Sequence, residues 1–181
     1  MKPIFLIGYM GCGKTTLGSA LAETMHVPFI DLDDLIEQRQ HKSVREIFAE
    51  IGENGFRQLE RSTLLNVALT TEAIVACGGG TPCYADNMAL MNQHGTTVHL
   101  TTSIDRLTTR LTLPEHKAKR PLIANKSDDE IRQFISDALA TRLPFYNQAS
   151  LQFDSTDIET AEATAIRAEQ LKQTLADKHL L

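Results

Sequence analysis

The sequence Gly8-Tyr9-Met10-Gly11-Cys12-Gly13-Lys14-Thr15 matches the pattern G-x-x-x-x-G-K-[ST] in full. A short apolar run, Ile4-Phe5-Leu6-Ile7, precedes it as a strand would, and Leu17, Leu21 and Met25 follow it at helical spacing. Glycines allow several backbone N–H groups to face one anion, and a helix N-terminus adds partial positive charge. Strand, loop and helix together therefore predict a phosphate-binding loop.

The loop and the first turn of its helix contain the groups expected to hold a nucleotide with Mg2+. Lys14 would reach the β- and γ-phosphates, and the hydroxyl of Thr15 would bind the metal. Cys12 stands where the loop offers a backbone N–H, so we interpret it as a small filler rather than a nucleophile. The expected nucleotide contacts are Gly11, Cys12, Gly13, Lys14, Thr15 and Thr16.

Composition indicates one soluble domain over residues 1–181. The chain is 42% hydrophobic and 23% charged, which is ordinary for a globular protein. Its net charge of −5 argues against a nucleic-acid partner. Three cysteines without a C-x-x-C pair favour a reducing cytoplasm over a disulfide framework. We expect no signal peptide and no membrane span, because a strand begins almost at once and apolar runs stay near five residues.

Strand-like and helix-like segments alternate along the chain. Candidate strands cover residues 4–7, 28–31, 73–77, 97–100 and 151–153. Helices separate these strands. Three helices are expected to start near Leu35 and at the S-x-x-E capping boxes of Ser43 and Ser127. Further helices are expected over about 56–67, 85–94, 103–111 and 158–178. Gly95 is expected to be a C′ glycine. The alternation predicts an α/β fold of βαβ units, a mainly parallel sheet with helices on both faces.

Residues 112–126 form a basic, proline-bearing segment, which we interpret as a closing lid over about 112–123. Asn125-Lys126-Ser127-Asp128 also spells N-K-x-D, the guanine-reading motif of GTP-binding switches. That motif follows a buried strand in such proteins, whereas here it follows the basic segment and overlaps a capping box. We therefore interpret it as the end of the lid and the start of a helix.

Carboxylates and glycines follow two of the predicted strands. Asp31 and Asp33 come after the second strand, at the edge where an open parallel sheet binds ligands. One of them would hold the waters of Mg2+ and the other would accept a proton from an attacking hydroxyl. The alternative is that they only cap the next helix. Gly78, Gly79 and Gly80 follow the third strand, either to let backbone approach a ligand or to make a tight turn.

Arginines supply the complementary charge. Arg57, Arg120 and Arg142 could together clamp a carboxylate or a phosphate, although each alone is more often a solvated surface charge. Glu60, one turn after Arg57, could hold that arginine in place. Arg106 and Arg110 share a helix face, and either of them could stack on a base.

This ordered set of motifs resembles the shikimate kinase family over about residues 1–155. The resemblance rests on the loop at 8–15, F-x-D-x-D at 29–33, F-R-x-x-E at 56–60, G-G-G at 78–80, R-P-L at 120–122 and R-x-x-x-Y at 142–146. It implies a three-layer P-loop kinase fold with strand order 2-3-1-4-5. It also implies transfer of the ATP γ-phosphoryl group to the 3-hydroxyl of shikimate, with Mg2+. The segment 154–157 lacks the proline that many members place against the adenine.

The resemblance also implies roles by position. A shikimate-binding region would cover about 33–62, and shikimate contacts would come from Asp33, Arg57, Gly78, Gly79, Gly80 and Arg142. Thr15 and Asp31 would serve the metal. Lys14, Asp33 and Arg120 would be the catalytic groups, with Lys14 and Arg120 neutralising the migrating phosphoryl and Arg110 stacking on adenine.

Three other functions are weighed against this one. A kinase of another small polyol acid, such as gluconate, shares the loop and lid but has no need of the paired arginines with F-x-D-x-D. A GTP-dependent switch rests on N-K-x-D alone. A nucleotide-binding scaffold without catalysis has no use for acids, glycines and arginines at three strand ends. We expect a monomer.

Overall fold

The computed structural model describes residues 1–118 and 122–181 of the chain. In these residues five strands form one sheet in the order β2-β3-β1-β4-β5, and every neighbouring pair is parallel. The strands are β1 (Ile4–Ile7), β2 (Phe29–Asp31), β3 (Ile74–Ala76), β4 (Thr96–Thr101) and β5 (Leu151–Asp154). The predicted α/β fold and strand order are confirmed, and no predicted strand end is wrong by more than one residue.

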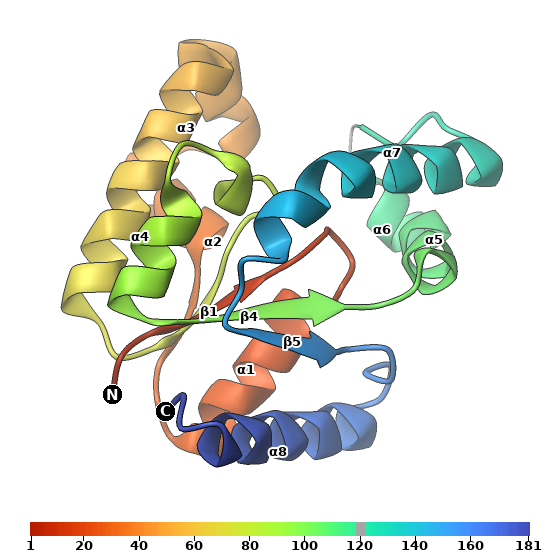
Figure 1. The fold of residues 1–181 in the computed structure, drawn as a ribbon. Coiled ribbons are helices and arrows are strands. Elements are labelled where there is room, and N and C mark those ends of the chain that lie inside the picture. Colours follow the sequence, from red (N-terminus) through yellow and green to blue (C-terminus); the bar gives the residue numbers. More distant parts are fainter. Residues whose placement is uncertain (119–121) are drawn as a thin grey trace.

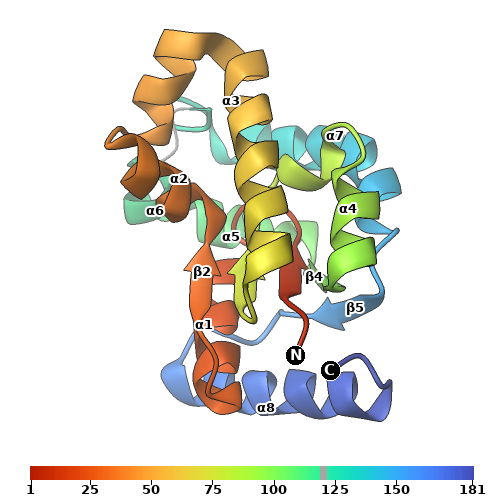
Figure 2. The same cartoon turned by 90° about the vertical axis from the view of Figure 1, so that its left-hand side faces the viewer.

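Helices cover both faces of the sheet, as Figure 1 shows. The helices of the described residues are α1 (Lys14–Met25), α2 (Leu32–Gln40), α3 (Val44–Thr70), α4 (Asn87–His94), α5 (Ile104–Thr112), α6 (Pro114–Ala118), α7 (Asp128–Tyr146) and α8 (Ala161–Asp177), with a 3-10 turn η1 (Thr81–Cys83). The α1 and α8 helices pack together beneath the sheet, while α3 and α4 lie on the opposite face. Figure 2 shows the same layers from the side, with both termini at one end of the molecule.

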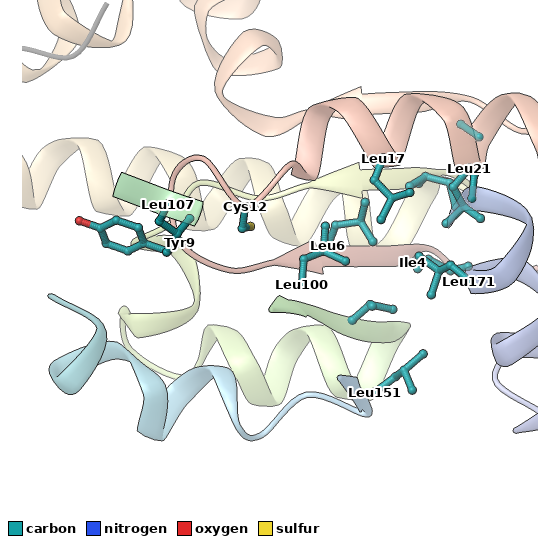
Figure 3. Packing of buried hydrophobic residues seen from close by; sticks show 14 of the residues in the cluster. Ile4, Leu6, Tyr9, Cys12, Leu17, Leu21, Leu100, Leu107, Leu151 and Leu171 are labelled. Carbon is teal, nitrogen blue, oxygen red and sulfur yellow. The ribbon is translucent and has the colours of Figure 1, made fainter. Parts of the chain in front are cut away.

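The central strand β1 separates two hydrophobic cores. Its side chains alternate between the faces because strand residues have a period of two. Ile4 and Leu6 join the core under α1 and α8, whereas Phe5 and Ile7 join the core under α3 and α4. Figure 3 shows Leu6 of β1 and Leu17 of α1 converging in the first of these cores. This burial fixes the strand ends, and with them the loops that carry the chemistry.

The junction between β2 and α2 differs from the expectation. The α2 helix begins at Leu32, not near Leu35, so Asp33 and Asp34 lie in its first turn. Asp31 is the N-cap, and its carboxylate accepts a hydrogen bond from the backbone N–H of Asp33 at 3.1 Å. Asp31 and Asp33 therefore do not project from one extended segment. Asp31 therefore caps α2 and also lies at the carboxyl end of β2, the edge at which ligands were expected to bind.

Two glycine positions also differ from the sequence interpretation. The predicted helices at 43 and at 56–67 merge into α3, which bends at Gly52, whose φ of 69° and ψ of 179° are non-helical. Gly95 is not a left-handed C′ residue, because its backbone is extended with φ at −160°. A Cβ on Gly95 would lie 2.2 Å from the carbonyl oxygen of Pro3, so the glycine is needed for close backbone packing.

The expected lid segment contains a short helix, α6, rather than loop alone. Arg120, which the sequence assigns to catalysis and nucleotide binding, lies outside the described residues. Ser127 caps α7 through a complete capping box with Glu130, as the sequence predicted for Asn125-Lys126-Ser127-Asp128. No helix in the described parts of the chain has the length and apolar character needed to cross a membrane.

Candidate active site

The loop between β1 and α1 has the backbone that a phosphate cradle requires. Gly8 and Gly13 have φ of 142° and 94°, which side-chain-bearing residues rarely adopt. A Cβ on Gly8 would lie 2.8 Å from the carbonyl oxygen of Leu100, and one on Gly13 would lie 2.0 Å from Cδ1 of Ile158. Among residues 1–118 and 122–181, no side chain caps the N-terminus of α1, so its first N–H groups remain available to an anion.

Lys14 and Thr15 lie at the centre of this cradle. The Lys14 ammonium donates to the carbonyl oxygens of Gly8 at 2.9 Å and Tyr9 at 3.1 Å, which holds it beside the loop. The Thr15 hydroxyl donates to Asp31 Oδ2 at 3.0 Å. A hydroxyl beside a carboxylate is an all-oxygen donor set of the kind that Mg2+ prefers. These residues therefore fit a nucleotide with its magnesium ion.

Asp33 faces this cradle from the first turn of α2. Burial raises the pKa of its carboxyl group to about 6, and the neighbouring carboxylates of Glu60 and Asp31 add to the rise. The positive charges of Lys14 and Arg57 oppose it. A carboxylate with a pKa near 6 is ionised at neutral pH and is still basic enough to accept a proton from a hydroxyl.

Arg57 is held from behind by a buried carboxylate, as the sequence predicted. Glu60, which is 1% exposed, accepts from Arg57 Nη1 at 2.7 Å through Oε2. Its other oxygen accepts from the Thr81 hydroxyl at 2.5 Å. A Cβ on Gly80 would lie 2.5 Å from Arg57 Nη2, so the absence of a side chain there makes room for the guanidinium. The sequence interpretation missed Thr81.

Arg142 reaches the same glycine turn from α7. A Cβ on Gly79 would lie 3.1 Å from its Nη1, and its guanidinium carbon lies 5.4 Å from the centre of the Tyr9 ring. The hydroxyl of Tyr146 donates to the carbonyl oxygen of Gly79 at 2.6 Å, which anchors the turn to α7. Tyr9 was not predicted as a supporting residue, although it stands within the loop motif. Nor was Tyr146, although it ends the R-x-x-x-Y motif.

The glycine turn joins these groups into one site. A Cβ on Gly78 would lie 3.1 Å from Glu60 Oε1 and 3.3 Å from Asp33 Oδ1. Two arginines and an acid from separate elements thus meet around three consecutive glycines, beside the phosphate cradle. An arrangement with guanidinium groups and a carboxylate suits a small acceptor that carries a carboxylate and hydroxyls.

Arg110 lies beside the cradle, in contact with the segment that follows β5. Its guanidinium donates to the carbonyl oxygens of Gly11 at 3.1 Å and Thr156 at 2.7 Å, and to Glu159 Oε1 at 2.9 Å. These contacts fix its plane at the rim of the nucleotide-binding loop. Arg106, the alternative for base stacking, is 45% exposed and pairs at 3.6 Å with Glu159.

Comparisons with known proteins agree with this geometry. A model of the shikimate kinase family matches residues 10–175. The shikimate kinase of Phocaeicola vulgatus is 48% identical over 97% of this chain and 99% of the relative, and that of Parabacteroides distasonis is 48% identical over 88% and 91%.

Solved structures give the same result. The shikimate kinase of Bacteroides thetaiotaomicron superposes with a TM-score of 0.91 at 46% identity, covering 97% of this chain and 98% of that one. The Acinetobacter baumannii enzyme, solved in complex with shikimate, gives 0.84 at 29% identity, covering 100% of this chain and 96% of that one. From its phosphate loop, its strand order and these relatives, the chain belongs to the shikimate kinase family.

Proposed function

We infer that this protein transfers the γ-phosphoryl group of ATP to the 3-hydroxyl of shikimate, giving shikimate 3-phosphate and ADP for chorismate and aromatic amino-acid biosynthesis. The observation that carries this inference is the convergence of Arg57, Arg142 and Asp33 on the glycine turn beside the phosphate loop. Phosphoryl transfer asks a protein mainly for positioning and charge neutralisation, and both ends of the site supply charge of the required sign.

At the nucleotide end, backbone N–H groups of residues 11–16 hold the phosphates. Lys14 exchanges its bonds to the loop carbonyls for the β- and γ-phosphate oxygens and stabilises the charge that develops on them. Thr15 and Asp31 hold Mg2+, which supplies further neutralisation of the phosphate oxygens when bound. Arg110 orders the rim on which the adenine rests, and Arg120 adds a second positive charge near the transferred group.

At the acceptor end, Arg57 and Arg142 bind the carboxylate of shikimate in the fork geometry that guanidinium groups favour. Asp33 orients the 3-hydroxyl and accepts its proton as the phosphoryl group arrives. Gly78, Gly79 and Gly80 let the ring lie against bare backbone. The segment 112–123 closes over both ligands and excludes water, which would otherwise take the phosphoryl group.

A coupled assay of ADP release tests this function directly. Shikimate should support ADP release only with Mg2+ present, and gluconate at the same concentration should give the background rate. Release with gluconate but not with shikimate would contradict the assigned acceptor. A steady rate without any acceptor would indicate a nucleotide hydrolase instead.

We also propose that the protein acts as a monomer in the cytoplasm, without nucleic-acid or membrane partners. The net charge of −5 supports the absence of a polyanion partner, and the free cysteines support a reducing compartment. Light scattering after size exclusion should give a mass near the 20.1 kDa of one chain. A mass of twice that value would reject the monomer.

A further inference from the structure

The segment that follows β5 packs against the phosphate loop, far from it in the chain. The Ser155 hydroxyl lies 2.7 Å from the carbonyl oxygen of Cys12, which stands 143 positions earlier. Ile158 reaches the next residue, since its Cδ1 lies 2.0 Å from the position that a Cβ on Gly13 would take. Ser155 is 0% exposed and Ile158 is 8% exposed. Two buried side chains of this segment therefore hold the peptide between Cys12 and Gly13.

The sheet fixes the position of the Ser155 hydroxyl. The backbone N–H of Ser155 donates to the carbonyl oxygen of Thr101 at 2.8 Å, which continues the pairing of β4 with β5 past Asp154. The hydroxyl has one proton and two carbonyl oxygens within reach, that of Cys12 at 2.7 Å and that of Thr101 at 3.1 Å. The Cys12 oxygen is nearer, and within the described residues it has no other donor. We therefore assign the proton to the bond with Cys12.

A carbonyl group held in this way also orients the N–H of the same peptide. The peptide between Cys12 and Gly13 is planar and trans, so its N–H points opposite to its C=O. The bond that turns the Cys12 carbonyl toward Ser155 therefore turns the Gly13 N–H away from that segment. Among residues 1–118 and 122–181, nothing accepts a hydrogen bond from this N–H. Gly13 is the N-cap of α1, where free N–H groups bind phosphate.

The preceding peptide of the loop is held from the same segment. Arg110 donates to the carbonyl oxygen of Gly11 at 3.1 Å, while its other terminal nitrogen donates to the carbonyl oxygens of Ser155 at 3.2 Å and Thr156 at 2.7 Å. Two consecutive carbonyl groups of the phosphate loop are thus fixed from outside, one directly by Ser155 and one through Arg110. The loop keeps its shape before a nucleotide binds, which lowers the ordering cost of binding.

We propose that Ser155 is a positioning residue for the nucleotide phosphates, because its hydroxyl sets the peptide plane that directs the Gly13 N–H at them. Ser155 itself touches no ligand and acts through this peptide. Without the hydroxyl, the buried Cys12 carbonyl has no donor, and the peptide rotates toward another partner at the expense of the N–H direction. The effect on turnover rests on the proposed function, whereas the effect on nucleotide binding needs no acceptor.

Amide spectra of the 15N-labelled full chain give the first test. The Gly13 amide proton should move downfield when ADP and Mg2+ are added, because a phosphate oxygen becomes its acceptor. Ser155→Ala should show a smaller shift of the same proton at saturating ADP. A Gly13 proton that does not respond to ADP in the parent protein would overturn the proposal, whether or not the variant folds.

Binding and kinetic constants give the second test. Ser155→Ala should weaken ADP about three- to tenfold in calorimetry and raise the KM for ATP by a similar factor, while the KM for shikimate stays within about twofold. Tripolyphosphate, which has no base, should lose the same factor as ADP, because the change lies in the phosphate loop. Weaker ADP with unchanged tripolyphosphate would place the effect at the Arg110 rim and overturn the proposal.

Thr97→Val is the matched control for a merely structural hydroxyl. Thr97 lies in β4, is 0% exposed, and bonds through its hydroxyl to Asn92 and Ser150 rather than to the phosphate loop. Its loss should lower the unfolding temperature and leave ADP affinity unchanged. If Ser155→Ala behaved in the same way, the proposal would fall. Full ADP responses in a protein that does not phosphorylate shikimate would instead reject the proposed function and leave the role of Ser155 intact.

Discussion

Arg57 contributes both to acceptor binding and to the stability of the fold. Its replacement by alanine therefore has two effects, which kinetics and unfolding measure separately. Removal of one guanidinium from a desolvated carboxylate costs about 2–5 kcal/mol, which raises the KM for shikimate about 30-fold to several thousand-fold. The KM for ATP should stay near its original value, because no hydrogen bond or ion pair described for Arg57 involves the phosphate loop. Steady-state kinetics with each substrate varied in turn measure both constants.

The same replacement leaves the buried Glu60 carboxylate with the Thr81 hydroxyl as its remaining described partner. An uncompensated buried group of this kind costs about 1–3 kcal/mol of folding free energy. Adding Glu60→Gln removes the unpaired charge and keeps an acceptor for Thr81, so the double variant should regain thermal stability. It should not regain the KM for shikimate.

Arg61→Ala is the matched control on the same helix. Arg61 pairs with Asp86 at 2.6 Å and with Asn87 at 2.7 Å, and none of its described bonds reaches Gly78, Gly79 or Gly80. Its removal should leave both KM values unchanged. An Arg57→Ala enzyme with a normal KM for shikimate, or a double variant that regains it, would refute the carboxylate clamp.

Lys14, Asp33 and the lid segment provide further tests of the same geometry. Lys14→Met should lower kcat by about two orders of magnitude or more while the fold survives, and turnover close to that of the parent would contradict the phosphate-loop assignment. The kcat/KM for shikimate should fall about tenfold per unit below pH 6, the pKa of Asp33, and Asp33→Asn should lose mainly kcat. The pKa of Asp33 is higher in the folded protein than in an unfolded chain. Ionisation of its carboxyl group therefore lowers the free energy of unfolding as the pH rises from about 4 through 6. Asp33→Asn should therefore be more stable than the parent at pH 8, by about 1–2 kcal/mol in urea titrations, and no more stable below pH 4. Amide exchange over 112–118 and 122–123 should slow when ATP analogue and shikimate are both bound, and equal protection without ligands would argue against a closing lid.

The sequence predicts the frame of this molecule well, because the frame depends on local signals. The loop at 8–15, the strands and the two capping boxes are specified by residues close together in the chain. The α2 helix begins at Leu32, earlier than the predicted start near Leu35, because Asp31 takes the N-cap position and accepts a hydrogen bond from the N–H of Asp33. The role of Gly95 depends on Pro3, more than ninety residues away, and no local pattern carries that information.

The residues of the candidate site also fall into those that local sequence signals identify and those that they do not. Charged and glycine residues were identified by type and position, since strand ends of a parallel sheet converge. The uncharged supports were not identified, because Thr81 and Tyr146 hold the site through hydrogen bonds to Glu60 and Gly79 that only the fold brings together.

The bonds from Lys14 to the carbonyl oxygens of Gly8 and Tyr9 reduce the entropy that the lysine side chain loses when nucleotide binds. A free lysine side chain loses about 2 kcal/mol of rotamer entropy when it is fixed. Here that ordering takes place during folding, before any nucleotide arrives. Phosphate binding is then an exchange of one set of oxygen partners for another, made by an ammonium group that is already in position.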